Sequence, residues 1–304
     1  MNDKRVLIFG ATGNVGGATA REMLRRGWQV RAVTRNPQSE KAQALAALGA
    51  EVVQGDMDDR ASLGRVVEGF PRVLSVQNWQ VSGPEGEVRQ GRQVAEAAHS
   101  AGVEHLVFAS AGTGEADTGV PHFDNKLVIE AYMRDLGLPF TVVRPVPFME
   151  LMTAKMFFPP VGIWGFSPKV LGWDTPLPWV AVRDIGIANA NIFENPADWI
   201  GREIILCGDV KTLSECREIY KAVNGKKPFR IPLPLWLFRK MAGDELIVMW
   251  RWMKAWIAEQ GPQGLEKIRE ASRAVCPDPL DVASWLKMEQ NGGKGNVKTG
   301  GNYE

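Results

Sequence analysis

The chain has 304 residues, of which 45% are hydrophobic and 23% are charged, and its formal net charge is +1. This balance is typical of a globular protein and gives no electrostatic reason to expect direct nucleic-acid binding. No apolar run approaches the about 20 residues that a membrane span needs, so we expect no membrane span. The three cysteines have no spacing typical of a disulfide framework or a zinc site. We expect a cytoplasmic protein, because the cysteines suit a reducing compartment and the first predicted strand leaves no room for a secretory signal.

The first predicted strand runs directly into a glycine-rich turn. Val6-Leu7-Ile8-Phe9 is an apolar run typical of a parallel strand buried on both faces, and residues 10–16 read Gly-Ala-Thr-Gly-Asn-Val-Gly. Apolar residues then recur at helical spacing until Gly27. A pyrophosphate reaches backbone N–H groups only where no Cβ intervenes, and a helix N-terminus attracts an anion. Between a strand and a helix, these glycines predict a dinucleotide-binding turn.

Strands and helices alternate from this turn to Val143. Further strands are predicted at 29–34, 51–54, 72–76, 104–108 and 140–143, and helices at 38–48, around 63–67, from Pro84, and at 123–136. Strict alternation predicts parallel pairing with right-handed crossovers. The predicted fold class is therefore α/β, a doubly wound parallel-sheet Rossmann fold with its ligand crevice beyond the carboxyl ends of the strands.

The alternation stops at Pro145, and this change suggests a second domain. We expect a Rossmann domain at 1–150, completed by a helix and a strand within 180–208. Residues 151–179 and 209–288 would form a smaller, mostly helical C-terminal substrate domain; the first of these segments is rich in Pro, Phe and Trp and suits either a pocket or an irregular subdomain. The glycine-rich end, 289–304, predicts a disordered tail.

A tryptophan-rich segment lies within the second predicted domain. Residues 246–257 include Trp250, Trp252 and Trp256 together with charged residues, a pattern that predicts an amphipathic helix. Core packing is its simplest interpretation. A lid over a pocket or a dimer contact is the alternative.

Arg35 follows the second predicted strand, where an NAD-specific site usually has an acidic residue. A guanidinium can bind a 2′-phosphate through two hydrogen bonds. The position therefore favours NADP(H) over NAD(H), and a solvated loop residue is the alternative.

Other candidate cofactor-binding residues follow the third, fourth and fifth predicted strands. Asp56 and Met57 could bind adenine, although Asp56 is equally suited to a turn. Gln77 and Asn78 end the fourth strand at the mouth of the crevice, and Ser110 ends the fifth.

Two residues are candidates for a direct part in the reaction. His122 and Lys126 are four residues apart on a predicted helix and share a face. A lysine there could hold the nicotinamide ribose, and the histidine could donate or accept a proton. The alternatives are a surface histidine at a helix N-terminus and a solvated lysine.

Together these motifs resemble the NmrA-like family of atypical short-chain dehydrogenase/reductases. The resemblance covers about residues 4–190 and includes residues 10–16, Arg35, 55–57, 108–110, the His-Phe-Asp-Asn-Lys element at 122–126, 144–150 and 182–186. It implies NADP(H) binding at Gly10, Thr12, Gly13, Asn14, Val15, Gly16 and Arg35. It also implies that Lys126 lies close to the nicotinamide ribose, with Pro145 to Phe148 near the nicotinamide.

The resemblance leaves two functions open. Some family members reduce quinones, dyes or phenylpropanoids with NADPH, and others act as redox-sensing regulators of partner proteins. His122 stands where the wider superfamily has its catalytic tyrosine, which removes standard tyrosine acid catalysis. Because residues 148–179 are rich in aromatic side chains, we expect an NADPH-dependent reductase of an apolar quinone- or carbonyl-like molecule, with Lys126 and His122 as catalytic residues. The alternative is a non-catalytic NADP(H) sensor that binds a protein partner, and either protein could form a homodimer.

Overall fold

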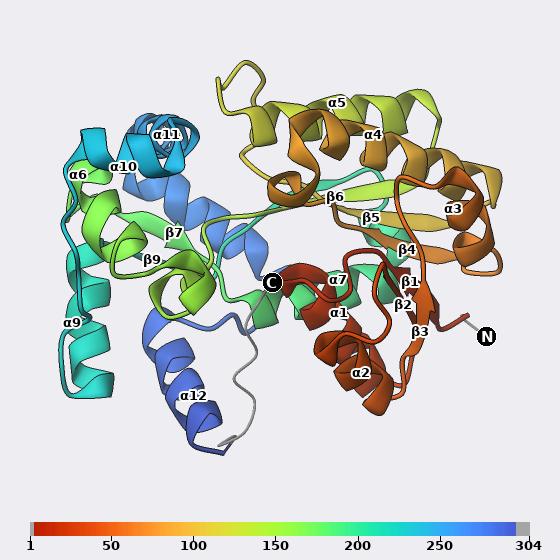
Figure 1. Ribbon diagram of the computed structural model, residues 1–304, viewed down its shortest axis with the longest axis horizontal. Helices are drawn as coiled ribbons and strands as arrows, with labels where there is room; N and C mark the ends of the chain where they lie inside the picture. Colours follow the sequence, from red (N-terminus) through yellow and green to blue (C-terminus); the bar gives the residue numbers. More distant parts are fainter. Residues whose placement is uncertain (1–2, 296–304) are drawn as a thin grey trace. The chain divides into compact units, whose positions relative to one another are not determined.

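The computed structural model describes residues 3–295 of the chain (Figure 1). The chain forms two compact units. The first consists of the residues up to Asp117, Pro121–Pro145 and Ile185–Ile205. The second consists of Thr118–Val120, Val146–Asp184 and the residues from Leu206 onward.

The first unit is built on a seven-stranded sheet with the strand order β3-β2-β1-β4-β5-β6-β8. The β1–β2, β2–β3, β1–β4, β4–β5 and β5–β6 pairs are all parallel. Because β2 lies on one side of β1 and β4 on the other, the strand order reverses at β1, where such folds bind their ligands. The strands are β1 (Arg5–Ile8), β2 (Gln29–Thr34), β3 (Glu51–Gln54), β4 (Arg72–Ser75), β5 (His105–Ala109), β6 (Phe140–Pro145) and β8 (Glu203–Leu206).

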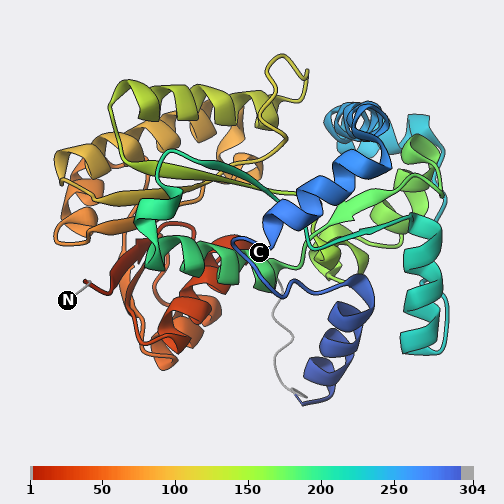
Figure 2. The ribbon, with the colours of Figure 1, turned by 180° about the vertical axis from the view of Figure 1, so that it is seen from behind.

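Helices cover both faces of this sheet, which confirms the doubly wound fold (Figures 1 and 2). On one face lie α3 (Arg60–Val67), α4 (Trp79–Ser100) and α5 (Pro121–Asp135). On the other lie α1 (Asn14–Arg25), α2 (Glu40–Ala47) and α7 (Val182–Glu194), and the short α8 (Pro196–Trp199) follows α7.

The start of α4 differs from the prediction, which placed it at Pro84. The helix begins at Trp79, and the Asn78 side chain caps it by accepting a hydrogen bond from the Gln80 N–H. The backbone leaves the helical conformation at Gly83 (φ 72°), and Pro84 then begins the long regular part. The proline pattern therefore identified the longer part of a helix that has a break near its start.

One core cluster of the first unit lies between the sheet and the α4–α5 layer. Leu7, Phe108 and Val94 are completely buried there. Gly91 explains how closely the two helices pack, since a Cβ at this position would lie 2.6 Å from the Cδ1 atom of Ile129. The predicted apolar face of α4 is therefore the face that packs on α5 and the sheet.

The second unit is mostly helical, as predicted, but it also contains a small antiparallel sheet of β7 (Leu177–Trp179) and β9 (Asp209–Lys211). Its first part consists of single turns at Met149–Met152, Lys155–Phe157 and Gly162–Phe166. The helices are α6 (Ser167–Leu171), α9 (Leu213–Asn224), α10 (Leu235–Ala242), α11 (Glu245–Ser272) and α12 (Val282–Gly295).

Two predictions in this unit concern its last helices. The tryptophan-rich segment begins α11, which has a break at Gly261; Trp250 and Trp256 are buried, so core packing is confirmed for these two side chains. The predicted disordered tail is wrong for residues 289–295, because α12 continues through this polar segment to Gly295. The rest of that prediction, 296–304, lies outside the described residues. Of the helices that the structure describes, none combines the length and apolarity that crossing a bilayer requires.

Candidate functional site

The three glycines of the first turn have distinct structural roles. Gly10 has a φ of +67°, and a Cβ there would lie 3.0 Å from the Cβ of Val76. The Gly13 N–H closes the turn by donating to the Gly10 carbonyl oxygen at 2.9 Å. A Cβ on Gly16 would lie 2.3 Å from that same oxygen, so only glycine lets α1 approach β1 this closely.

The turn leaves the N-terminus of α1 available to an anion. Gly13 is the N-cap residue, and it has no side chain that could accept a hydrogen bond from the first helical N–H groups. Thr12, Asn14 and Val15 complete the turn and are half-buried. The predicted pyrophosphate-binding residues therefore form one turn beside the switch in strand order, where a helix N-terminus favours a phosphate.

Arg35 directly follows β2, and its exposed side chain is accessible to a 2′-phosphate. The positive charge of Arg35 acts on the carboxylate of Asp58. Burial acts to raise the pKa of Asp58, but hydrogen bonds from Gln90 and Arg89 and the charges of Arg89 and Arg35 hold it below its ordinary value. Arg35 thus has one carboxylate with which a bound phosphate would compete.

Four predicted residues lie at the ends of β3 and β4. Asp56 accepts a hydrogen bond from the Asp58 N–H at 3.0 Å, so its carboxylate forms a turn, and Asn78 caps α4. Gln77 is buried, and its amide nitrogen lies 3.7 Å from the sulfur of Met57. The structure therefore brings Gln77 and Met57 together, and contacts of all four with adenine or ribose stay predictions.

Lys126 is buried, with 4% of its surface exposed, so the solvated-lysine interpretation is wrong. Its Nζ lies 3.0 Å from the Oε1 of Glu87, a carboxylate on α4 with a fully buried side chain. The ammonium also lies 3.5 Å from the Gln77 carbonyl oxygen and 5.2 Å from the centre of the Phe108 ring. The ammonium is thus fixed beside the ends of β4 and β5.

Sequence reasoning missed Glu87, although the sequence contains a signal. Glu87 lies four residues before Gly91 and seven before Val94, so it shares the apolar face of α4. A carboxylate on such a face needs a cation, since burying an unpaired charge is costly. Within the described residues, neither carboxylate oxygen has a well-aligned hydrogen bond, so the acid keeps unused acceptor capacity beside Lys126.

His122 is also buried, with 8% exposure, which contradicts the surface-histidine interpretation. Its ring stacks on Trp79 with a centroid distance of 4.9 Å and an interplanar angle of 10°. Phe123 contacts it edge-on at 4.6 Å. The predicted pair on α5 therefore consists of an aromatic-packed imidazole and an ion-paired ammonium.

The Ser110 hydroxyl belongs to a buried ionic cluster, which we call the Arg144 network. Arg144 forms two hydrogen bonds with Glu130, at 2.6 and 2.7 Å, and one with Glu203 at 2.7 Å. Ser110 donates to Glu130 and accepts from Arg144, both at 2.7 Å. Burial acts to lower the pKa of Arg144, but these carboxylates raise it above its ordinary value. The Ser110 side chain thus has a structural role, and a cofactor contact by this residue stays a prediction.

The last two predicted residues fall in different units. Pro145 ends β6 in the first unit, whereas Phe148 belongs to the second, where it forms a parallel bridge with Val180. Their contacts with the nicotinamide stay predictions. Nearby in the second unit, burial raises the pKa of Glu150 to about 7, and its Oε1 accepts a hydrogen bond from the Val182 N–H.

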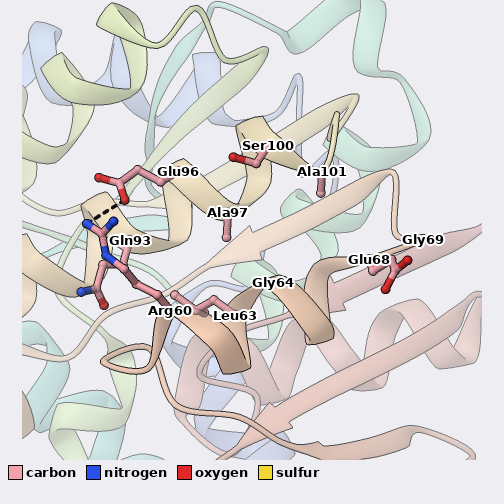
Figure 3. Close-up of a pocket in the computed structure, with 10 residues that line it drawn as sticks. All are labelled: Arg60, Leu63, Gly64, Glu68, Gly69, Gln93, Glu96, Ala97, Ser100 and Ala101. Carbon is pink, nitrogen blue, oxygen red and sulfur yellow. Dashed lines mark ion pairs between the residues drawn. The ribbon is translucent and has the colours of Figure 1, made fainter.

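A groove of about 440 Å³ lies between α3 and α4, away from these residues (Figure 3). An ion pair of Arg60 and Glu96, 2.9 Å apart, spans one end of it. The groove contains none of the predicted cofactor-binding residues. It lies along two helices, whereas parallel α/β sheets bind ligands beyond their strand ends, so we do not take it as the site.

Comparison with known proteins decides the family. The family model described as the NmrA-like family matches residues 2–286. The chain belongs to the NmrA-like family. Among curated members, the NmrA-like family domain-containing oxidoreductase lnaB of Aspergillus flavus is 30% identical over 257 residues, which is 77% of each chain.

Solved structures agree with this NmrA-like fold. NmrA, described as a negative transcriptional regulator and solved in complex with NADP, superposes with a TM-score of 0.75 at 19% identity, covering 98% of this chain and 99% of its own. The NADPH-dependent quinone oxidoreductase QOR2 of Escherichia coli, solved with NADPH, has a TM-score of 0.73 at 22% identity over 94% and 100%. At these identities the likeness shows the fold.

Proposed function

We propose that this NmrA-like protein is an NADP(H)-dependent oxidoreductase that reduces an apolar quinone- or carbonyl-like small molecule. The proposal rests mainly on the turn of Gly10, Gly13 and Gly16, which lies where the strand order reverses. Any Cβ at Gly16 would meet the backbone of Gly10, so the turn keeps the bare, open backbone that a pyrophosphate requires.

Preference for the phosphorylated cofactor rests on Arg35. It is an exposed guanidinium directly after β2, where NAD-specific folds have an acid. Two of the solved structures with this fold are complexes with NADP and with NADPH. We therefore expect Arg35 to bind the 2′-phosphate through charge-assisted hydrogen bonds.

Lys126 would orient the nicotinamide ribose. Its ammonium is already fixed by Glu87, and little side-chain entropy remains to be lost when it binds a hydroxyl. When bound, NADPH supplies the hydride, and the protein contributes binding, orientation and electrostatics. A proton would come from His122 or from water, and a quinone needs little help from a strong acid.

The substrate class is inferred from the sequence and from relatives. Residues 148–179, in the second unit, are rich in aromatic and proline residues, which suits a flat apolar molecule. The names of lnaB and QOR2 describe an oxidoreductase and a quinone oxidoreductase. These names support the reaction class without identifying the substrate.

A non-catalytic NADP(H) sensor is the second candidate. The observation that favours it is His122, which replaces the superfamily's tyrosine and is packed between Trp79 and Phe123. NmrA itself is described as a regulator. Such a sensor would bind the dinucleotide tightly and contact a protein partner, or a second copy, in a nucleotide-dependent manner.

The test is NADPH oxidation by the purified full chain with a panel of quinones and enones. The proposal predicts turnover with at least one apolar quinone, and a higher KM for NADPH in Arg35→Ala than in the wild type. Tight NADPH binding without turnover on the whole panel would refute the reductase in favour of the sensor.

A further inference from the structure

A second cluster of functional side chains lies in the second unit and contains none of the residues proposed to bind the cofactor. A hollow of about 300 Å³ is lined by Trp173, Ser214, Arg217, Glu218 and Arg230. Three of these residues come from the first turns of α9, one precedes β7, and one lies in the segment between α9 and α10. The Ser214 N–H donates to the Trp173 carbonyl oxygen at 3.0 Å, which ties Trp173 to the start of α9.

Two guanidinium groups each contact the same aromatic ring in this hollow. The guanidinium carbon of Arg217 lies 5.5 Å from the centre of the Trp173 ring, and that of Arg230 lies 5.4 Å from it. Each contact is a cation–π interaction, worth about 0.5–1 kcal/mol at exposed sites. The ring therefore holds both side chains in place while their guanidinium groups remain charged.

The positive charge of the two arginines is only partly balanced. In the part of the chain that the structure describes, no carboxylate lies within ion-pair distance of Arg217 or Arg230. Glu218 also lines the hollow; its Oε1 is paired with Lys227 Nζ at 2.6 Å, and the hydrogen bond from Lys227, together with the charges of Lys227, Lys221 and Arg217, lowers the pKa of Glu218. The hollow therefore carries a net positive charge from its two guanidinium groups.

Arg217 also has an unused hydrogen-bond donor. Its Nε is buried and has no acceptor among the described residues. A buried donor without an acceptor costs free energy, and two like charges on one ring repel each other. A bound anion that accepts from both guanidinium groups would relieve both costs.

We propose that this hollow, which we call the Trp173 site, binds a tetrahedral oxyanion of the phosphate type, either free phosphate or the phosphate group of a small molecule. Guanidinium forks match phosphate oxygens, and Arg217, Arg230 and Ser214, which all line the hollow, carry N–H or O–H donors. A planar carboxylate offers only two oxygens in one plane. The Trp173 site does not depend on the proposed oxidoreductase activity; it contains none of the proposed cofactor-binding residues, and Trp173 is its one residue from the aromatic segment 148–179.

The test is calorimetric titration of the full chain with inorganic phosphate at constant ionic strength. Saturating NAD, which carries no phosphate monoester, is present throughout, so that the glycine turn of the dinucleotide site is not available to phosphate. The variants are Arg217→Ala, Arg230→Ala, and the matched control Lys226→Ala, which removes one exposed positive charge of the same unit outside the hollow. Circular dichroism confirms that each variant folds, and Arg230 is exposed, so its replacement leaves the core intact.

We expect saturable phosphate binding to the wild type and to Lys226→Ala. Loss of a charged donor should weaken binding about tenfold or more in each arginine variant. Acetate should bind more weakly than phosphate, and a phosphate monoester such as glycerol phosphate should compete with phosphate. Equal phosphate binding by Arg230→Ala and the wild type would overturn the proposal, as would acetate binding at least as tight as phosphate.

Arg35→Ala separates this proposal from the proposed function. Because Arg35 belongs to the first unit, its replacement should weaken NADPH binding and leave phosphate binding at the Trp173 site unchanged when NAD is kept saturating. Loss of phosphate binding in Arg35→Ala under these conditions would assign the phosphate signal to the dinucleotide site and refute the Trp173 site.

Discussion

Replacement of Lys126 tests whether its buried ammonium acts on the cofactor or only neutralises Glu87. At 3.0 Å, two unit charges attract by about 5.5 kcal/mol with an effective dielectric constant of about 20. Removing one partner of such a buried pair leaves an uncompensated charge and costs about 3–5 kcal/mol. We expect Lys126→Ala to lower the free energy of unfolding by this amount, measured by urea denaturation. Lys4→Ala, which removes an exposed lysine of the same unit, should change it by no more than about 0.5 kcal/mol.

The double variant Lys126→Met/Glu87→Leu separates stability from function. Replacing both charges with apolar side chains of similar size removes the uncompensated charge, so most of the lost stability should return. NADPH affinity and turnover should stay low, because the ammonium is gone. Wild-type NADPH binding in the double variant would refute a role for Lys126 at the ribose. A destabilisation of less than about 1 kcal/mol in Lys126→Ala would refute the buried ion pair.

Three further predictions concern other parts of the chain. Ser110→Ala removes a hydroxyl bonded to two charged groups of the Arg144 network, so urea denaturation should show a loss of about 1.5–3 kcal/mol, and an unchanged midpoint would contradict this. Burial raises the pKa of Glu150 from 4.5 to about 7, so between these pH values the folded state keeps a proton that the unfolded state releases. The contribution of this proton to the free energy of unfolding is complete below pH 4.5 and is lost as pH rises through 7. Because glutamine does not titrate, the free energy of unfolding of Glu150→Gln should rise relative to that of the wild type by about 3 kcal/mol from pH 4 to pH 8. A difference that does not change with pH would contradict the raised pKa of Glu150. Gly16→Ala should abolish NADPH binding in a calorimetric titration, whereas Gly64→Ala, where a Cβ meets open space, should bind normally.

The sheet and its first turn could be predicted because the signals are local. A short apolar strand followed by Gly10, Gly13 and Gly16 predicts its own conformation, and the regular alternation of strands and helices fixes parallel pairing. The start of α4 was missed because Gly83 and Pro84 indicate a helix boundary, whereas the Asn78 cap and a tolerated break extend the helix upstream. The polar, glycine-rich residues 289–295 suggested disorder, but they continue α12.

The surroundings of the candidate site were less predictable, because long-range partners determine them. Lys126 was placed correctly on α5, but its burial depends on Glu87, which is 39 positions earlier in the chain. His122 looked exposed because a helix N-terminus usually is, and its cover, Trp79, comes from another helix. Ser110 looked available at a strand end, but Arg144 and Glu130 bind its hydroxyl. In each case the sequence identifies the side chain but not the residue that it meets in the fold.

The central claim is that the turn at Gly10 binds NADP(H) with Arg35 on the 2′-phosphate. The most direct measurement is calorimetric titration of the wild type and of Arg35→Ala with NADPH, NADP, NADH and NAD. We predict that the wild type binds NADPH and NADP about tenfold or more tightly than NADH and NAD, because the latter two lack the charge-assisted contact with Arg35. Arg35→Ala should bind all four about equally. Equal affinity of the wild type for NADPH and NADH would contradict the role of Arg35. A wild type that binds none of the four would contradict the dinucleotide turn itself.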